Sequence, residues 1–261
     1  MGEGSALPNW SAHDGNVPVA FIPATPLLLA GLNPRPTPEQ LAFIDATTAA
    51  TATLTECHRV LLIGSAGMGL RPDSAAPEAG LRRVPLPADG GATADGHATR
   101  PTSVLVGEQM LDRAAYRGPV AAFVAAGAPA DVRPLATTAS PDAHAVMPAD
   151  EPWRLRPGDG VLVVGDGTAT RHEKAPGHVV PGAVAMDDHI AVLLSSGDLD
   201  GLLDLDPALD QQFLLDGRAA WQAAAQLVAG SGRVVSSRLL GLFDPHHVAY
   251  FVAEWSVEVE A

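Results

Sequence analysis

Aspartate and histidine side chains near the ends of apolar segments are the residues of this sequence best suited to chemistry. Asp166 directly follows Gly160 to Gly165, a short apolar run that predicts a buried strand. An aspartate in this place either caps the following turn through its own backbone or faces a pocket, and the sequence leaves both interpretations open.

His172 lies on the same predicted loop, within the charged run Arg171 to Lys174. An imidazole titrates near neutral pH, so His172 could act as an acid or base on an anionic substrate held by the neighbouring cations. The alternative is a solvated loop with local ion pairs. The triplet Asp187 to His189, further along, falls in a predicted helix and is expected to be solvated.

A second pair of histidines, His246 and His247, falls between the last two predicted strands. Adjacent side chains on extended backbone point to opposite faces, so we do not expect both to bind one metal ion. One of them could form a site with His172 or Glu254, or both could be exposed turn residues. Glu254 alternates with apolar residues, and is either a buried functional carboxylate or the polar side of an edge strand. We take Asp166, His172 and His247 as the candidate catalytic residues.

The elements that must position these residues alternate between strands and helices. This order predicts an α/β fold, a three-layer single domain with a mostly parallel central sheet, helices on both faces and an antiparallel edge near the C-terminus. Ligands bind beyond the carboxyl ends of strands in such folds, which places the loops after Pro23, Gly64 and Gly165 around one site. The expected strands cover 17–23, 59–64, 119–125, 160–165, 233–242 and 248–257, and the expected helices 37–57, 104–117, 181–195 and 207–228.

Composition narrows the classes of partner. The formal net charge of −14 repels phosphate backbones, so we expect no nucleic-acid partner. The N-terminus does not resemble a signal peptide and no apolar run is long enough to span a bilayer, so we expect a cytoplasmic protein without a membrane partner.

Cys57 is the single cysteine and is expected to fill core space. The glycine run 64–69 matches neither the dinucleotide fingerprint nor a phosphate loop. A small-molecule ligand and a homo-oligomer are both compatible with these features.

Five segments resemble, in order, the B-subunit type of class III extradiol dioxygenase. The resemblance extends from near residue 17 to residue 255, and it implies one domain over 17–261 preceded by an N-terminal extension, 1–16. The segments are AFIPATPLLL (20–29), SVLVGEQMLDR (103–113), VVGDGTATRHEKAPG (163–177) followed by Met186-Asp187, SGDLDGLLDLDPALDQQFLLDGRAAWQ (196–222) and VAYFVAEW (248–255).

The resemblance implies non-haem Fe(II), bound in active members by two histidines and a carboxylate, with a further histidine as acid/base. This sequence departs from that pattern at each histidine. Ala24 and Thr25 stand where relatives have the first ligand, Gly64 to Gly67 where the second is expected, and Ala169 where the acid/base histidine is expected. We therefore expect no ordinary Fe(II) ring cleavage, and the cofactor and metal are left unknown.

Three hypotheses follow. The protein is a divergent extradiol dioxygenase-like protein that keeps a small-molecule pocket at the carboxyl ends of the strands. Alternatively, it is a metal-dependent oxidoreductase (dioxygenase) with a relocated site drawn from Asp166, His172, His246, His247 and Glu254. The third possibility is a non-catalytic interaction scaffold.

Overall fold

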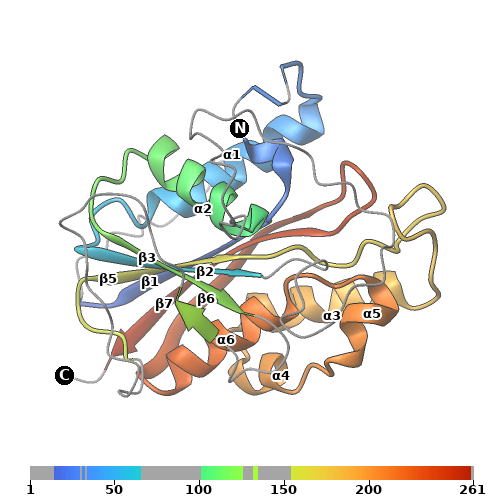
Figure 1. The fold of residues 1–261 in the computed structure, drawn as a ribbon. Coiled ribbons are helices and arrows are strands. Elements are labelled where there is room, and N and C mark those ends of the chain that lie inside the picture. Colours follow the sequence, from blue (N-terminus) through green and yellow to red (C-terminus); the bar gives the residue numbers. More distant parts are fainter. Residues whose placement is uncertain are drawn as a thin grey trace, which may run out of the picture.

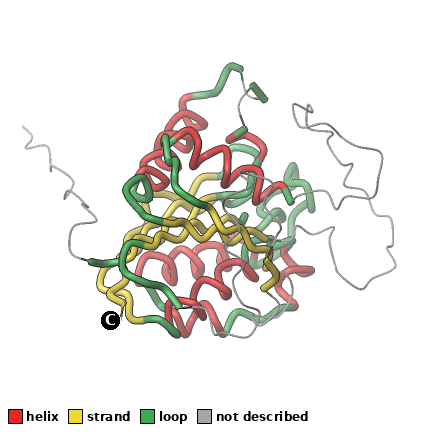
Figure 2. Tube along the Cα trace, turned by 60° about the vertical axis from the view of Figure 1, so that its left-hand side comes forward, coloured by secondary structure: helices red, strands yellow, loops and turns green. Residues whose placement is uncertain are grey.

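The protein forms a seven-stranded sheet between two layers of helices (Figures 1 and 2). The structure is a computed structural model and describes residues 15–29, 31–32, 34–65, 101–125, 132–134 and 154–259. The predicted N-terminal extension therefore lies almost wholly outside the described residues. The strands are β1 (Val17–Ile22), β2 (Arg59–Ser65), β3 (Val120–Ala125), β4 (Val132–Pro134), β5 (Asp159–Val164), β6 (Gly232–Phe243) and β7 (Tyr250–Val259).

The strand order is β4-β3-β2-β5-β1-β7-β6. The four central strands β3, β2, β5 and β1 run parallel, whereas β4 is antiparallel at one edge and the β6–β7 hairpin is antiparallel at the other. The predicted fold class is confirmed, including the antiparallel edge near the C-terminus. Strand β4 was not predicted from the sequence.

Helices cover both faces of the sheet because the central strands are apolar on both sides. One face packs against α1 (Pro38–Ala52) and α2 (Thr102–Arg113), and the other against α3 (Ala183–Ser196), α4 (Leu199–Leu203) and α6 (Arg218–Ala229) (Figure 1). Alternate residues of β5 divide between the two cores: Val161 and Val163 face α3 and α6, and Leu162 and Val164 face α1 and α2.

Helix boundaries follow local capping chemistry. Helix α1 begins at the predicted capping box, in which Thr37 Oγ1 accepts from Gln40 N at 3.3 Å and Gln40 Oε1 accepts from Thr37 N at 2.9 Å. The helix ends at Ala52, earlier than predicted, because Thr53 and Thr55 direct their hydroxyls at backbone carbonyls one turn back.

The predicted helix over 207–228 is wrong as a single element. It is divided into α5 (Ala208–Phe213) and α6, and Leu214 between them adopts a left-handed backbone with φ of 50°. A non-glycine residue in this conformation ends a helix. The break directs residues 214–217 toward the carboxyl ends of the strands.

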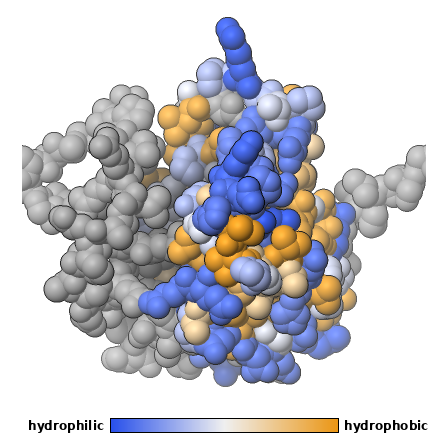
Figure 3. Space-filling view, turned by 90° about the vertical axis from the view of Figure 1, so that its right-hand side faces the viewer, coloured by the Kyte–Doolittle hydropathy of each residue, from blue (hydrophilic) through white to orange (hydrophobic). Residues whose placement is uncertain are grey.

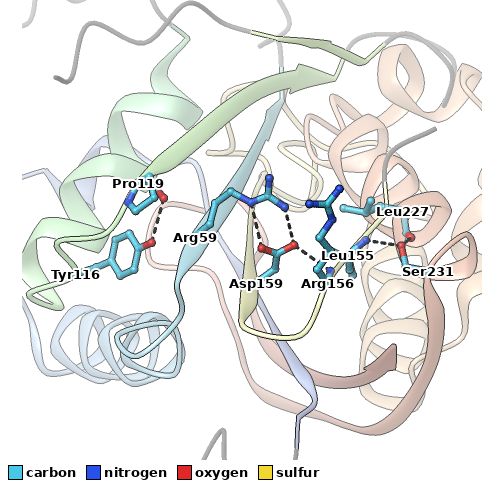
Figure 4. A network of polar contacts seen from close by, with 8 residues as sticks. All are labelled: Arg59, Tyr116, Pro119, Leu155, Arg156, Asp159, Leu227 and Ser231. Carbon is cyan, nitrogen blue, oxygen red and sulfur yellow. Dashed lines mark hydrogen bonds and ion pairs between the residues drawn. The ribbon is translucent and has the colours of Figure 1, made fainter. Parts of the chain in front are cut away.

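Polar contacts at the opposite, amino ends of the strands are structural. Arg59 opens β2 and Asp159 opens β5, and their side chains form a two-pronged ion pair of 3.1 and 2.7 Å (Figure 4). Asp159 also accepts from Arg156 N at 3.0 Å, which holds the turn before β5. This network closes the end of the sheet that lies away from the candidate site.

On the face shown in Figure 3, hydrophilic side chains are interrupted by groups of apolar side chains. The large apolar residues exposed in the described part of the chain are Leu32, Leu41, Val179, Val184, Val192 and Val235. Among the described residues, no helix is long and apolar enough to cross a membrane.

Candidate functional site

Three neighbouring parallel strands end at the same level and define the candidate site. In the sheet register, Val164 of β5 lies beside both Ile22 of β1 and Gly64 of β2. The next residues therefore emerge together, as expected for the carboxyl edge of a parallel sheet. Ala24 N donates a 2.7 Å hydrogen bond to Asp166 Oδ1, which joins the loops after β1 and β5.

A fourth segment reaches this edge through the helix break between α5 and α6. Asp216, in that break, accepts a 2.5 Å hydrogen bond on Oδ2 from Ser65 Oγ, at the end of β2. Gly217 N donates to Asp166 O at 2.7 Å, so the break is also held to the loop after β5. The edge therefore brings together Asp166 and Asp216, with Ser65 beside the second of them.

Glycine at two positions makes this approach possible. A Cβ on Gly165 would lie 2.5 Å from Gly217 Cα, and one on Gly217 would lie 2.9 Å from Asp166 O. Any side chain at either position would push the loop after β5 and the α5–α6 break apart. The distance between the two carboxyl groups is thus fixed by backbone packing.

Burial raises the proton affinity of both carboxyl groups, and the charge of a neighbouring aspartate adds to it in each case. The pKa of Asp166 rises to about 8, chiefly because of desolvation and next because of the Asp216 charge, against the Ala24 hydrogen bond, which lowers it. The pKa of Asp216 is also raised, by desolvation first, although the Ser65 hydrogen bond acts in the opposite direction. Both residues keep partial solvent exposure. Near neutral pH we therefore expect the Asp166 carboxyl group to be mostly protonated.

The walls of the site differ on the two sides of the sheet. Tyr250 lies on the α1–α2 side, where its hydroxyl is hydrogen-bonded to the Thr25 side chain; desolvation and then the Asp166 charge raise its pKa. Ser65 and Asp216 lie on the α6 side. Among the described residues, no arginine or lysine forms an ion pair with Asp166 or Asp216. Within the described part of the chain, the pair is therefore an acidic centre without an ion-pair partner.

The other two predicted site residues, His172 and His247, lie together on a neighbouring part of the surface. Their rings stack with centroids 4.2 Å apart and planes inclined by 18°. His172 Nδ1 accepts from Lys174 N at 3.1 Å, so the neutral ring carries its proton on Nε2. His246 points elsewhere, with Nε2 3.3 Å from Gln40 Nε2, but the two histidines lie in a turn, with His247 at a φ of 60°, and not on the extended backbone that the prediction assumed.

Asp187 was predicted to be a solvated helical residue, and this is wrong: its side chain is fully buried. It accepts from Thr168 N at 3.1 Å, Thr168 Oγ1 at 2.6 Å and Arg171 at 3.1 Å. Desolvation raises its pKa to about 6 against these hydrogen bonds. Asp187 thereby anchors the loop after β5 to α3, and Arg171, also 3.7 Å from Asp244, is engaged in holding that loop.

Glu254 of β7 is buried and bound to Arg238 of β6 by contacts of 2.8 and 2.6 Å. Desolvation raises its pKa, and the arginine lowers it. Glu254 is therefore a buried carboxylate and not an exposed residue of an edge strand. Arg238, on the neighbouring strand of the hairpin, compensates its charge.

The residues at the positions implied by the family resemblance do not fit Fe(II). Ala24 and Ala169 offer no donor side chain, and Thr25 Oγ1 accepts the hydrogen bond that caps the turn Pro26–Leu28. Ser65 is bound to Asp216, and residues 66 and 67 lie outside the described part. Nor do any three histidine, cysteine, aspartate or glutamate side chains of the described residues gather as metal ligands.

Ser65 and Asp216 are the site residues that the sequence analysis missed. Asp216 was assigned to the interior of a helix, although the following Gly217 interrupts an otherwise helix-forming run and could have marked a break. Ser65 was noted only as part of a turn that lacks a histidine. No protein-family model matches this chain, and a search of curated proteins finds no match, so the family resemblance stays a prediction.

Proposed function

We propose that this protein binds a small organic molecule at the carboxyl edge of its sheet, against Asp166 and Asp216, and does not carry out Fe(II)-dependent extradiol ring cleavage. The observation that supports the proposal is the carboxyl pair, which has no ion-pair partner among the described residues and in which Ala24 N and Ser65 Oγ each hold one member in place. A protein keeps such a pair partly buried at a cost in stability, and sites of this kind are found where proton transfer or ligand recognition needs them.

The charge of the pair favours certain ligands. Each carboxyl group can accept hydrogen bonds, can donate one while it is protonated, and adds negative charge when it ionises. Neutral molecules with hydroxyl groups, and protonated amines, are therefore expected to bind, whereas carboxylates are repelled. Arg171 is engaged by Asp187 and Asp244, which removes the main cation that an anionic ligand would need on this loop.

The test uses three ligands of matched size and different charge: benzylamine, benzyl alcohol and benzoate. Binding is measured at pH 7 by calorimetry and by the shift in melting temperature. We expect the amine or the alcohol to bind and benzoate not to bind. Asp166→Asn and Asp216→Asn should weaken binding of the amine, whereas Asp112→Asn, at an exposed ion pair with Arg117, should not.

A second measurement addresses the absence of ring cleavage. The protein is mixed with Fe(II) under anaerobic conditions, then given catechol and oxygen, and the ring-opened product is followed by absorbance. No turnover is expected. Turnover by the wild-type protein, or selective binding of benzoate, would contradict the proposed function.

A further inference from the structure

The contact between Ser65 and Asp216 has the arrangement of a nucleophile and its general base. The Ser65 hydroxyl donates a 2.5 Å hydrogen bond to Asp216 Oδ2. Ser65 is the last residue of β2, and its own carbonyl accepts from Ser103 Oγ at 2.6 Å, which fixes the backbone that carries it. A serine hydroxyl becomes an effective nucleophile when an adjacent base removes its proton.

Asp216 is better suited to this task than a solvated aspartate. Its carboxyl group lies in the α5–α6 break, where burial and the nearby Asp210 charge raise its pKa. A carboxylate with raised proton affinity is a stronger base when it is ionised. Asp210 itself is bound by the buried Arg218 through two contacts of 2.7 Å, so it holds the start of α6 in place and is not available as the base.

Asp166 lies at the same strand level as Ser65, on the adjoining strand. Val164 of β5 is beside Gly64 of β2 in the register, so Ser65 is level with Gly165, and Asp166 follows directly. Neighbouring strands are separated by about 4.8 Å, and the Asp216 charge acts on Asp166, so both carboxyl groups lie near Ser65 at this edge. Asp166 Oδ1 is occupied by Ala24 N, and a proton on the carboxyl group would let its other oxygen donate a hydrogen bond.

We propose that Ser65 is a nucleophile that takes an acyl group from a small carboxylic ester, with Asp216 as general base and protonated Asp166 as hydrogen-bond donor to the carbonyl oxygen. This inference rests on the proposed binding of small molecules at the same edge. It specifies the substrate as an uncharged ester, in keeping with the negative charge of the pair.

The atoms balance without a cofactor. Ser65 Oγ bonds to the carbonyl carbon, its proton passes to Asp216, and the carbonyl oxygen takes up negative charge beside Asp166. The ester C–O bond then breaks, the leaving alkoxide takes the proton from Asp216, and acyl-Ser65 remains. Water adds to the acyl carbon with loss of a proton to Asp216, and collapse releases the carboxylic acid as Ser65 regains its proton.

The experiment uses a fluorophosphonate probe, which forms a stable phosphoryl ester with activated serines and releases fluoride. The wild-type protein is treated at pH 7 and the labelled peptide is located by mass spectrometry. We expect one adduct, on Ser65. Labelling should disappear in Ser65→Ala and slow by at least about 100-fold in Asp216→Asn, the scale of lost general-base catalysis. Ser237→Ala, which removes an exposed hydroxyl bonded to Ser195 O, serves as the control and should label like wild type.

The same variants are tested for hydrolysis of p-nitrophenyl acetate across pH 5 to 10. We expect activity that falls at alkaline pH as Asp166 loses its proton, with this fall absent in Asp166→Asn, and we expect activity to be lost in Asp216→Asn. Wild-type protein that gives no adduct on Ser65, or an adduct on another serine alone, would overturn the inference, and this result does not depend on the folding of any variant. If benzylamine or benzyl alcohol still binds in a manner sensitive to Asp166, the proposed function stands without the acyl transfer.

Discussion

Replacing Asp166 with asparagine should stabilise the protein at alkaline pH and leave it little changed at acidic pH. The pKa of Asp166 is raised in the folded state from 3.8 to about 8. A raised pKa means that the native protein binds more protons than the unfolded chain between these values. Its contribution to stability is therefore full below the unfolded pKa and is lost as the pH rises through the folded pKa.

The magnitude follows from the size of the shift. Each pH unit between the two pKa values corresponds to about 1.36 kcal/mol, so the three units between pH 5 and pH 8 give an upper value of about 4 kcal/mol. Asp166 keeps partial solvent exposure, and screening reduces this amount, so we expect about 2 kcal/mol. Asparagine avoids the loss because it retains an oxygen for Ala24 N, and its amide nitrogen replaces the protonated carboxyl oxygen.

Urea unfolding of wild type and Asp166→Asn at pH 5 and pH 9 measures the effect. Between pH 5 and pH 9, the free energy of unfolding of the variant should increase relative to that of wild type. Asp112→Asn is the matched control, because the Asp112 side chain is largely exposed and its difference should stay constant. A difference for Asp166→Asn that is equal at the two pH values would refute the argument that burial and Asp216 hold a proton on this carboxyl group.

Two further predictions concern the surroundings of the site. Arg238→Ala leaves the buried carboxylate of Glu254 without its ion-pair partner and should cost about 3 to 5 kcal/mol in urea unfolding, whereas Arg233→Ala, in an exposed pair on the same strand, should cost about 1 kcal/mol or less. Equal costs for the two variants would contradict the role given to burial. Gly165→Ala should cost about 1 to 3 kcal/mol in urea unfolding and abolish probe labelling of Ser65, because the new Cβ would lie 2.5 Å from backbone. Gly230→Ala is the control: its nearest contact is at 3.4 Å, so both stability and labelling should be unchanged.

The layers of the fold could be predicted because each element carries its own local pattern. Short apolar runs bounded by glycine, such as Gly160 to Gly165, are typical of buried strands, and their alternation with helices leaves few topologies. The capping box at Thr37 likewise marks the start of α1 without reference to distant residues. The position of Asp166 at the carboxyl edge followed from the same reasoning.

The partners within the site could not be predicted, because they depend on distant contacts. Ser65 and Asp216 are 151 residues apart in the sequence. Asp187 shows the same difficulty: a polar triplet on a helix is usually solvated, and only the approach of Thr168 and Arg171 from the loop after β5 explains its burial. Similarly, the stacking of His172 on His247 arises from the packing of that loop against the β6–β7 turn, which no local pattern encodes.

The break between α5 and α6 explains both the wrong prediction and the existence of the site. Apolar residues at helical spacing run through 207–228, and a continuous helix would place Asp216 in its interior, bonded to its own backbone. The left-handed Leu214 ends α5, and Gly217, which lacks a side chain, lies against Gly165 closely enough to bond Asp166 O. The cost of interrupting a helix at these residues is offset locally by that contact and by the hydrogen bond from Ser65. A strained helix end that delivers a buried carboxylate to a serine has no evident benefit for folding, and such strain is found where function requires it.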